Sequence, residues 1–195
     1  MIAIVDYGAG NINSVRKALE HLRADAQVTS DPLVVAAAEK IIVPGVGHFS
    51  RCQSLNANLR EPVLAAIHHG KPFLGICVGM QWLFAGSTEA PEIPGAALFA
   101  GECSRFPASV KSPHVGWNQI EVNNNSRLLN GVNSGAFVYY THSFRAPVVE
   151  ETAACTSYGG AFSAAVERDN VFGVQFHPEK SAETGLKILE NFCAL

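Results

Sequence analysis

Lys71-Pro72-Phe73-Leu74-Gly75-Ile76-Cys77-Val78-Gly79-Met80-Gln81 is the segment from which the architecture of this chain is best inferred. Its first four residues are typical of the end of a buried strand, and residues 80–85 are typical of the start of a helix. A cysteine between two glycines at such a turn matches the elbow that carries the nucleophile in α/β hydrolytic enzymes. The glycines permit a tight turn where a side chain would clash. A helix N-terminus favours a thiolate and offers N–H groups to an oxyanion, so Cys77 is predicted to be the nucleophile of an acyl transfer.

Alternating strands and helices surround this elbow. Further buried strands are predicted at residues 2–5, 40–43 and 171–176. Helices are predicted over residues 54–69, near the C-terminus after Ser181 as N-cap, and around Val15, Ala18, Leu19 and Leu22. Strands that alternate with helices indicate an α/β fold with a doubly wound, mostly parallel sheet and helices on both faces.

The pattern changes after residue 86. Residues 87–100 are typical of a loop, and short alternating segments follow at 101–106, 115–122, 136–141, 152–157 and 162–167. These segments predict a small antiparallel layer added to the parallel sheet. Because no linker or repeat interrupts the chain, residues 1–195 are predicted to form a single domain.

The bulk composition narrows the class of protein. The chain has 195 residues, of which 48% are hydrophobic and 16% charged, and this balance is typical of a globular protein with a buried sheet. The formal net charge of −3 gives no reason to expect a nucleic-acid partner. Neither a signal peptide nor a membrane span is predicted. Five scattered cysteines without a C-x-x-C pair fit a reducing cytoplasm better than a disulfide framework or a metal site, so no metal is predicted.

A cysteine nucleophile needs a base, and His177 is the best candidate. It follows the predicted strand at 171–176, at the sheet edge where α/β proteins bind ligands. Residues i and i+2 of an extended segment share a face, and Pro178 keeps His177 extended, so Glu179 is predicted to orient the imidazole.

An oxyanion hole needs two donors. One candidate is the backbone N–H of Val78, directly after the nucleophile. The other is the turn Pro44-Gly45-Val46-Gly47, in which N–H groups of Val46 and Gly47 can approach a substrate closely. Taken alone, that turn is more typical of an ordinary loop.

Together these motifs resemble class I glutamine amidotransferases, the family with a Cys-His-Glu triad. The chain order matches: an oxyanion strand with Pro-Gly, then G-x-C-x-G-x-Gln, then His-Pro-Glu near the C-terminus. Narrower segments are similar to the glutaminase subunits of imidazole glycerol phosphate synthase, and the similarity runs from residue 1 to 195. These segments are residues 6–11, 44–49, 113–118, 140–143 and 175–181. The chain departs from that family at Val78, His48 and Thr141, where Leu, Ala and Val are usual, and at residues 94–100, a stretch that is usually richer in glycine.

The resemblance implies a substrate and a chemistry. Glutamine would be cleaved to glutamate and ammonia by Cys77, His177 and Glu179, without any cofactor. Its binding residues would be Gln81, Glu89, His142 and Ser143.

The resemblance also implies a partner. Ammonia would pass to a separate (β/α)8-barrel synthase subunit, which makes imidazole glycerol phosphate and aminoimidazole carboxamide ribotide in histidine biosynthesis. Residues in segments that this family places near the barrel are Asn11, Asn13, Trp117, Tyr139 and Lys180. From the sequence alone, Trp117 is equally typical of a core aromatic, and Lys180 is more typical of a surface charge.

Three alternatives remain open at this point. The first is an amidotransferase subunit that serves another acceptor, for example in surface-sugar amidination. The second is a cysteine peptidase or a DJ-1-like protein with the same kind of elbow. The third is a binding module that keeps the fold without catalysis, although the presence of Cys77, His177 and Glu179 argues against it.

Overall fold

The computed structural model describes residues 1–123 and 125–195, and its centre is an eight-stranded sheet. The strand order is β2-β1-β3-β4-β12-β11-β10-β7. Their bounds are β1 Ile2–Val5, β2 Ala26–Thr29, β3 Lys40–Val43, β4 Phe73–Ile76, β7 Glu121–Val122, β10 Thr152–Ser157, β11 Ala161–Arg168 and β12 Val171–Val174. The predicted strands at 2–5 and 40–43 are confirmed with the same bounds, and the strand at 171–176 ends two residues early.

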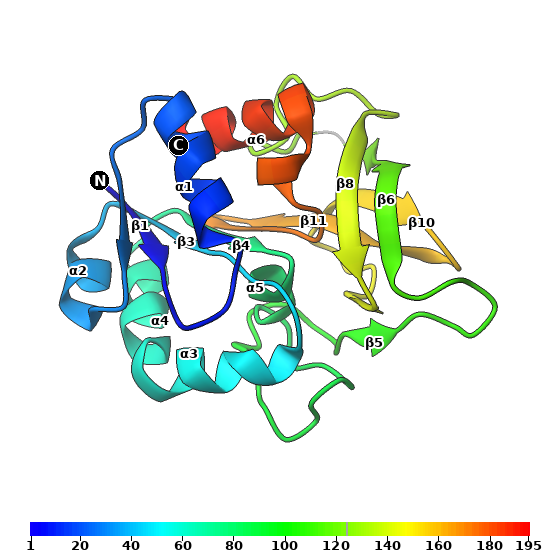
Figure 1. Cartoon of the computed structure of the whole chain (residues 1–195), viewed down its shortest axis with the longest axis horizontal. Helices are drawn as coiled ribbons and strands as arrows, with labels where there is room; N and C mark the ends of the chain where they lie inside the picture. The colour runs from blue at the N-terminus through cyan, green and yellow to red at the C-terminus, as the bar shows by residue number, and fades with distance from the viewer. Residues whose placement is uncertain (124) are drawn as a thin grey trace.

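The sheet is parallel in one part and antiparallel in the other. Neighbours from β2 to β12 pair in parallel, whereas β12 with β11, β11 with β10 and β10 with β7 pair antiparallel. The sequence predicted a small antiparallel layer added to the parallel sheet. Three of the added strands, β7, β10 and β11, continue the main sheet, because β11 pairs directly with the edge of β12 (Figure 1).

Two further sheets of two strands each lie beside the main one. β5 Ser104–Arg105 pairs with β9 Phe144–Arg145, and β6 His114–Gln119 pairs with β8 Phe137–His142, both antiparallel. Figure 1 shows β6 and β8 standing across the end of the main sheet that carries β10 and β11. These strands therefore make up the added antiparallel structure that the short alternating segments predicted.

Helices cover both faces of the main sheet. α1 and α6 lie on one side, and α3 and α4 with α2 lie on the other (Figure 1). The bounds are α1 Ile12–His21, α2 Pro32–Ala37, α3 Cys52–Asn58, α4 Arg60–His68, α5 Val78–Gln81 and α6 Ala182–Ala194, with short 3-10 helices η1 Phe49–Arg51 and η2 Pro178–Lys180. The doubly wound α/β architecture predicted from the sequence is confirmed.

Three local predictions were wrong in detail. The single helix predicted over 54–69 is two helices, because the backbone at Leu59 leaves helical geometry at φ −120°. The helix after the elbow was predicted at 80–85, but α5 has four residues and begins directly after Cys77. Ser181 stands at the N-cap position of α6, yet its side chain makes no capping bond and instead donates to the carbonyl of His177.

One strand and one helix were missed. β2 and α2 follow α1, and α2 carries a start signal that the sequence shows. Asp31 is its N-cap, with a carboxylate that accepts from the N–H of Leu33 at 2.8 Å, and Pro32 occupies its first turn.

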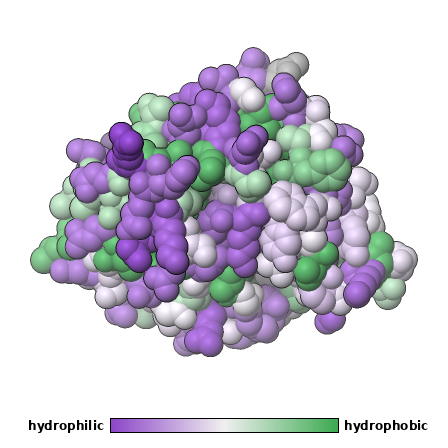
Figure 2. Space-filling view, turned by 45° about the horizontal axis from the view of Figure 1, so that its top comes forward, coloured by the Kyte–Doolittle hydropathy of each residue, from purple (hydrophilic) through white to green (hydrophobic). Residues whose placement is uncertain are grey.

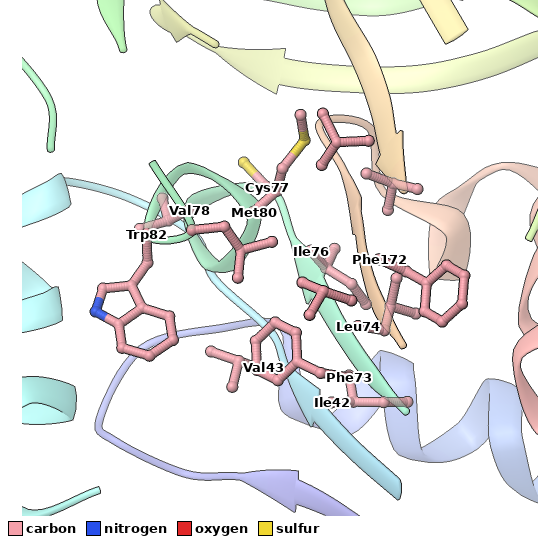
Figure 3. Packing of buried hydrophobic residues seen from close by; sticks show 14 of the residues in the cluster. Ile42, Val43, Phe73, Leu74, Ile76, Cys77, Val78, Met80, Trp82 and Phe172 are labelled. Carbon is pink, nitrogen blue, oxygen red and sulfur yellow. The ribbon is translucent and has the colours of Figure 1, made fainter. Parts of the chain in front are cut away.

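The core runs along β4 at the centre of the sheet. All four residues of β4 and of β12 are buried, as are those of β1, which is typical of parallel strands covered on both faces. Figure 3 shows Cys77 at the end of the packed side chains of Phe73, Leu74 and Ile76. The nucleophile position is thus held by the most buried part of the molecule.

The surface is mixed in character. On the face in Figure 2, hydrophobic residues gather in small groups among hydrophilic ones. None of the helices in the described residues is both long and apolar enough to cross a lipid bilayer.

Candidate active site

Three adjacent parallel strands end at the same edge of the sheet, and each delivers one part of the site. β3 leads into Pro44-Gly45, β4 leads into Cys77, and β12 leads into Gln175 and His177. The register keeps these ends level, since Ile76 pairs with Val174 and the N–H of Cys77 donates to the carbonyl of Val174 at 2.8 Å. Groups that lie far apart in the chain therefore converge at the carboxyl edge, as predicted.

The elbow at Cys77 is strained and tightly packed. Cys77 has φ +53° and ψ −107°, an unusual backbone conformation for a residue with a side chain. Gly75 and Gly79 are required by space, because a Cβ at Gly75 would overlap the carbonyl of Gly79 and one at Gly79 would overlap that of Val43. The glycines thus let the turn lie against β3 while the strain falls on the nucleophile itself.

His177 and Glu179 form a buried pair. Nδ1 of His177 lies 2.9 Å from Oε1 of Glu179, and each side chain is 1% exposed. The contact was predicted, but the geometry behind it was wrong in part. His177 is extended at φ −101° and ψ 97°, whereas Glu179 lies in the 3-10 turn η2. The carboxylate also accepts from Nδ2 of Asn11 at 3.2 Å, and the carbonyl of Tyr139 accepts from the N–H of His177 at 2.9 Å.

The charge of His177 depends on its neighbours. Burial lowers its pKa, but the charge of a Cys77 thiolate and the Glu179 carboxylate raise it more strongly, to about 10. The imidazolium is therefore the resting form at neutral pH, and an imidazolium next to a cysteine favours the nucleophilic thiolate.

Backbone donors are available on both sides of Cys77. The N–H groups of Val46, Gly47 and Val78 make no hydrogen bond with the described residues. Val78 opens α5, where the first N–H groups have no partner inside the helix. These are the donors that the sequence predicted for an oxyanion hole.

A cavity of about 370 Å³ opens beside the thiol. Its walls come from the turn after β3, the elbow, residue 89 and the end of β8. The lining residues are Val46, Gly47, His48, Cys77, Val78, Gln81, Glu89, Pro113, Thr141, His142, Ser143 and Phe144. All four residues predicted to bind glutamine are in this wall, and so are the three departures from the family pattern at His48, Val78 and Thr141.

The side chains of two of these wall residues are held in place by hydrogen bonds. Oε2 of Glu89 accepts from the N–H of Phe49 at 2.8 Å, which fixes its carboxylate at the cavity. Nε2 of Gln81 donates to the carbonyl of Phe144 at 2.8 Å and to Oε1 of Gln175 at 3.1 Å. Because both N–H groups of Gln81 are engaged, only its Oε1 remains for a ligand, and this oxygen accepts from an amide or ammonium group.

His142 contributes a fixed, uncharged imidazole. Burial lowers the pKa of His142 to about 3 and that of His114 to about 4. Nδ1 of His142 donates to the carbonyl of Phe144 at 2.8 Å, and its Nε2 lies 3.2 Å from Nδ1 of His114. Nε2 of His114 accepts from Asn118 at 3.3 Å, so the tautomers of both rings are determined.

Four of the five residues expected near a partner lie on one surface. Trp117 is 52% exposed and packs edge-on against Tyr139 at 6.0 Å, and Nζ of Lys180 lies 5.9 Å from the centroid of the Tyr139 ring. Trp117 and Lys180 line a hollow between β6, η2, α6 and α1, the helix that also carries the exposed Asn13. Asn11, directly before α1, is partly buried, and its amide donates to Glu179, which lines the same hollow.

The sequence did not predict the site contacts of three residues. These are Gln175 with Cys77, His114 with His142, and Asn11 with Glu179. Gln175 is fully buried, and its Nε2 lies 3.7 Å from Sγ of Cys77. A signal for it exists, because a glutamine in an apolar strand must satisfy its amide inside the protein. No comparable signal pairs His114 with His142, since register across β6 and β8 sets that contact.

Comparison with known proteins shows the family of this chain. The family model "Glutamine amidotransferase class-I" matches residues 3–195. The imidazole glycerol phosphate synthase subunit HisH of Methanothermobacter thermautotrophicus is 46% identical over 193 residues, which cover 98% of this chain and 97% of the relative. The HisH subunit of Thermococcus kodakarensis is 46% identical over 198 residues, covering 98% of each chain.

Solved structures agree on the fold. A glutamine amidotransferase superposes with a TM-score of 0.78 at 17% identity and covers 100% of both chains. PurLQS from Thermotoga maritima superposes with a TM-score of 0.77 at 22% identity, over 98% of this chain and 96% of the other. The fold, the converging triad geometry and the match along nearly the whole sequence lead to one conclusion: the chain belongs to the class I glutamine amidotransferase family.

Proposed function

We propose that this chain is the glutaminase subunit of imidazole glycerol phosphate synthase in histidine biosynthesis. It hydrolyses glutamine to glutamate and ammonia and delivers the ammonia to a (β/α)8-barrel synthase subunit. The observation that carries the proposal is the buried pair of His177 and Glu179 next to Cys77, whose thiol lines the cavity, in a chain 46% identical to HisH subunits over nearly its full length.

The first chemical step forms a thioester. The thiolate of Cys77 attacks the side-chain carbonyl carbon of glutamine, and the oxyanion accepts hydrogen bonds from the free N–H groups beside the cavity. His177, protonated at rest, donates its proton to the departing amine, which leaves as ammonia.

The second step regenerates the enzyme. Once Cys77 is acylated its negative charge is gone, and with it the largest influence that raises the pKa of His177. The imidazole then accepts a proton from water, which attacks the thioester and releases glutamate. Glu179 holds Nδ1 throughout, so Nε2 exchanges the proton in both steps.

The proposal includes the arrangement of the protein. Residues 1–195 act as one glutaminase domain, because a single sheet combines strands from both halves of the chain. The barrel subunit docks on the surface of Trp117, Tyr139 and Lys180, at the hollow that Glu179 also lines. The protein acts in the cytoplasm, which fits five cysteines that form no disulfide.

Replacement of Cys77 by alanine separates the two halves of this function. In the complex with the barrel subunit and its nucleotide, Cys77→Ala is expected to abolish glutamine-dependent synthesis, a loss of more than a thousandfold, because no other group forms the thioester. Synthesis from ammonium salts is expected to continue near the wild-type rate. Both rates are measured by product formation on the barrel.

Cys193→Ala is the matched control, since Cys193 is a half-buried thiol on α6. It is expected to keep both activities. Glutamine use by the Cys77→Ala complex would refute the assignment of the nucleophile. If the ammonia is instead used by a barrel subunit with a different acceptor, the assignment as a glutaminase stands. The assignment to histidine biosynthesis is then wrong.

A further inference from the structure

We propose that Gln175 is a further catalytic residue, whose side-chain N–H donates to the sulfur of Cys77 and stabilises the thiolate. The carbonyl of Phe144 sets the direction of this bond through Gln81. The inference rests on the proposed function for its role in turnover, but the contact itself is independent of the substrate.

The donors and acceptors in this hydrogen-bond network can be assigned starting from the backbone carbonyl of Phe144. A backbone carbonyl only accepts, so Gln81 must turn its Nε2, and never its oxygen, towards Phe144 at 2.8 Å. The same carbonyl accepts from Nδ1 of His142 at 2.8 Å. Since His142 is uncharged and its other nitrogen faces His114, this second donor is fixed as well.

The fixed orientation of Gln81 then determines that of Gln175. The amide nitrogen of Gln81 also lies 3.1 Å from Gln175, so the atom it meets there must be the acceptor Oε1. Gln175 consequently presents its Nε2 to Sγ of Cys77, at 3.7 Å. Gln81 is 2% exposed and Gln175 is fully buried, so water does not compete for these groups.

A donor at this place has a chemical effect on the nucleophile. Cys77 is itself 2% exposed and directly follows a buried strand, where a thiolate lacks the hydrogen bonds of water. One N–H donor to a charged acceptor stabilises the ion more than the neutral thiol. The same bond favours the sulfur as a leaving group when water cleaves the thioester, because negative charge returns to it.

The test uses Gln175→Met in the full-length chain, alone and with the barrel subunit. Methionine keeps the length and most of the volume of the side chain but removes the donor. The rate of Cys77 alkylation by iodoacetamide is measured at about pH 6.5 and about pH 9.5. We expect a roughly tenfold slower reaction at the lower pH and a change under about twofold at the higher pH, because a donor to the thiolate matters most where the solvent favours the protonated form. Glutamine turnover should lose kcat while KM stays within about twofold.

Asn170→Leu is the matched control. Asn170 precedes the same strand at its opposite end, where its amide donates to the carbonyls of Ile67 and Lys71. Its loss removes a partly buried amide of the same strand without touching the thiol, and the ratio of alkylation rates at the two pH values should stay as in wild type. Gln175→Glu, which keeps the shape but turns an oxygen towards the sulfur, carries the test if the methionine variant does not fold, and it should slow alkylation at least as strongly.

An unchanged ratio of rates in Gln175→Met, or in Gln175→Glu, would overturn the inference, as would an equal change in Asn170→Leu. Failure of the proposed function is a separate outcome, visible as absent glutamine hydrolysis by the wild-type complex while the pH-dependent slowing of alkylation persists.

Discussion

At the scale of single residues, the charge state of His177 depends on the charge on the sulfur of Cys77. Burial lowers its pKa, and the Cys77 thiolate and the Glu179 carboxylate together raise it to about 10, with Cys77 as the larger of these two influences. Cys77→Ala removes that charge, so the pKa of His177 should fall by several units towards or below its ordinary value of 6.5. The pH titration of its ring resonances by NMR measures this fall.

The direction of the pH effect follows from the same shift. In wild type the folded chain holds a proton on His177 more tightly than the unfolded chain does. The resulting contribution to stability is complete below pH 6.5 and is lost as the pH rises through about 10. Cys193→Ala serves again as a control, because its thiol lies on α6, and should leave the titration near 10. A Cys77→Ala variant whose His177 still titrates there would contradict the coupling.

The proposed triad could be assembled from the sequence because its members follow the ends of strands that converge at one edge of the sheet. Gln175 could not be predicted in the same way. Its role depends on which of its two amide atoms faces Cys77, and this is decided by the carbonyl of Phe144, thirty-one positions earlier in the chain. Orientation of a buried amide is a property of the hydrogen-bond network rather than of a motif.

At the scale of elements, the contact between β3 and the start of α5 leaves no room for a methyl group at Gly79. A Cβ there would overlap the carbonyl of Val43, which belongs to the neighbouring strand and cannot move freely. Gly79→Ala is therefore expected to lower the free energy of unfolding by about 2–3 kcal/mol and to displace Cys77, with a loss of glutamine turnover. Chemical denaturation measures the first effect.

Gly86→Ala provides the comparison for this prediction. The closest atom to a Cβ at Gly86 is 3.4 Å away, an ordinary contact, and Gly86 follows the elbow helix by only a few residues. This variant should change the free energy of unfolding by less than about 1 kcal/mol. Equal stability of the two variants would show that the close approach of α5 to β3 is not needed.

The pairing of β6 with β8 makes the fold sensitive to acid. His142 has a pKa of about 3 in the folded chain, below its ordinary 6.5, so the unfolded chain binds a proton that the folded one does not. Its contribution to stability is complete above pH 6.5 and is lost as the pH falls from there towards 3. At pH 5 this histidine should cost the wild type about 2 kcal/mol relative to neutral pH, measured by urea unfolding.

His142→Gln removes the titrating group and should flatten the decline between pH 7 and pH 5. His21→Gln, at the exposed end of α1, is the matched control and should decline like the wild type. A slope that is unchanged in His142→Gln would contradict a buried, uncharged imidazole between β6 and β8.

Elements were easiest to predict where apolar residues formed an unbroken run. β1 and β3 had the predicted bounds because buried parallel strands are apolar on both faces. The short α5 could not be bounded, since the turns after Gln81 remain apolar and only their hydrogen bonds distinguish them from helix. The break at Leu59 was hidden for a related reason: the residues keep helical spacing across it.

At the scale of the whole molecule, Trp117 and Tyr139 lie on the surface proposed to bind the barrel subunit. Trp117 is 52% exposed and contacts few parts of the core, so Trp117→Ala should leave the fold intact. Loss of a large aromatic from the middle of an interface raises Kd by about tenfold or more. Titration of the variant with the barrel subunit by calorimetry gives the value.

Leu33→Ala is a control of the same kind, because Leu33 is 78% exposed and lies on α2, which is remote from β6 and β8 (Figure 1). Its Kd should equal that of the wild type. A docking surface elsewhere on the molecule would appear as equal binding by the Trp117→Ala variant.

The overall class of fold was predictable, but the pairing of the antiparallel strands with the parallel sheet was not. Alternating short segments indicated antiparallel strands, and nothing in them states that β11 pairs with β12 while β6 and β8 form a sheet of their own. Such pairing depends on long-range register, and it places His142 at the cavity that Cys77 occupies.

The neighbouring positions of β4 and β12 have a consequence for how the protein is made. Phe73 pairs with Val171, so a ribosome exposes the nucleophile strand long before its partner strand exists. Until β12 is synthesised, one edge of β4 has no strand to bond with, a state that invites wrong pairing. The nascent thiol also has no histidine beside it, since His177 follows on the same late segment. The pairing of β12 with β4 and the arrival of His177 beside Cys77 are therefore expected to occur together, after β12 is synthesised.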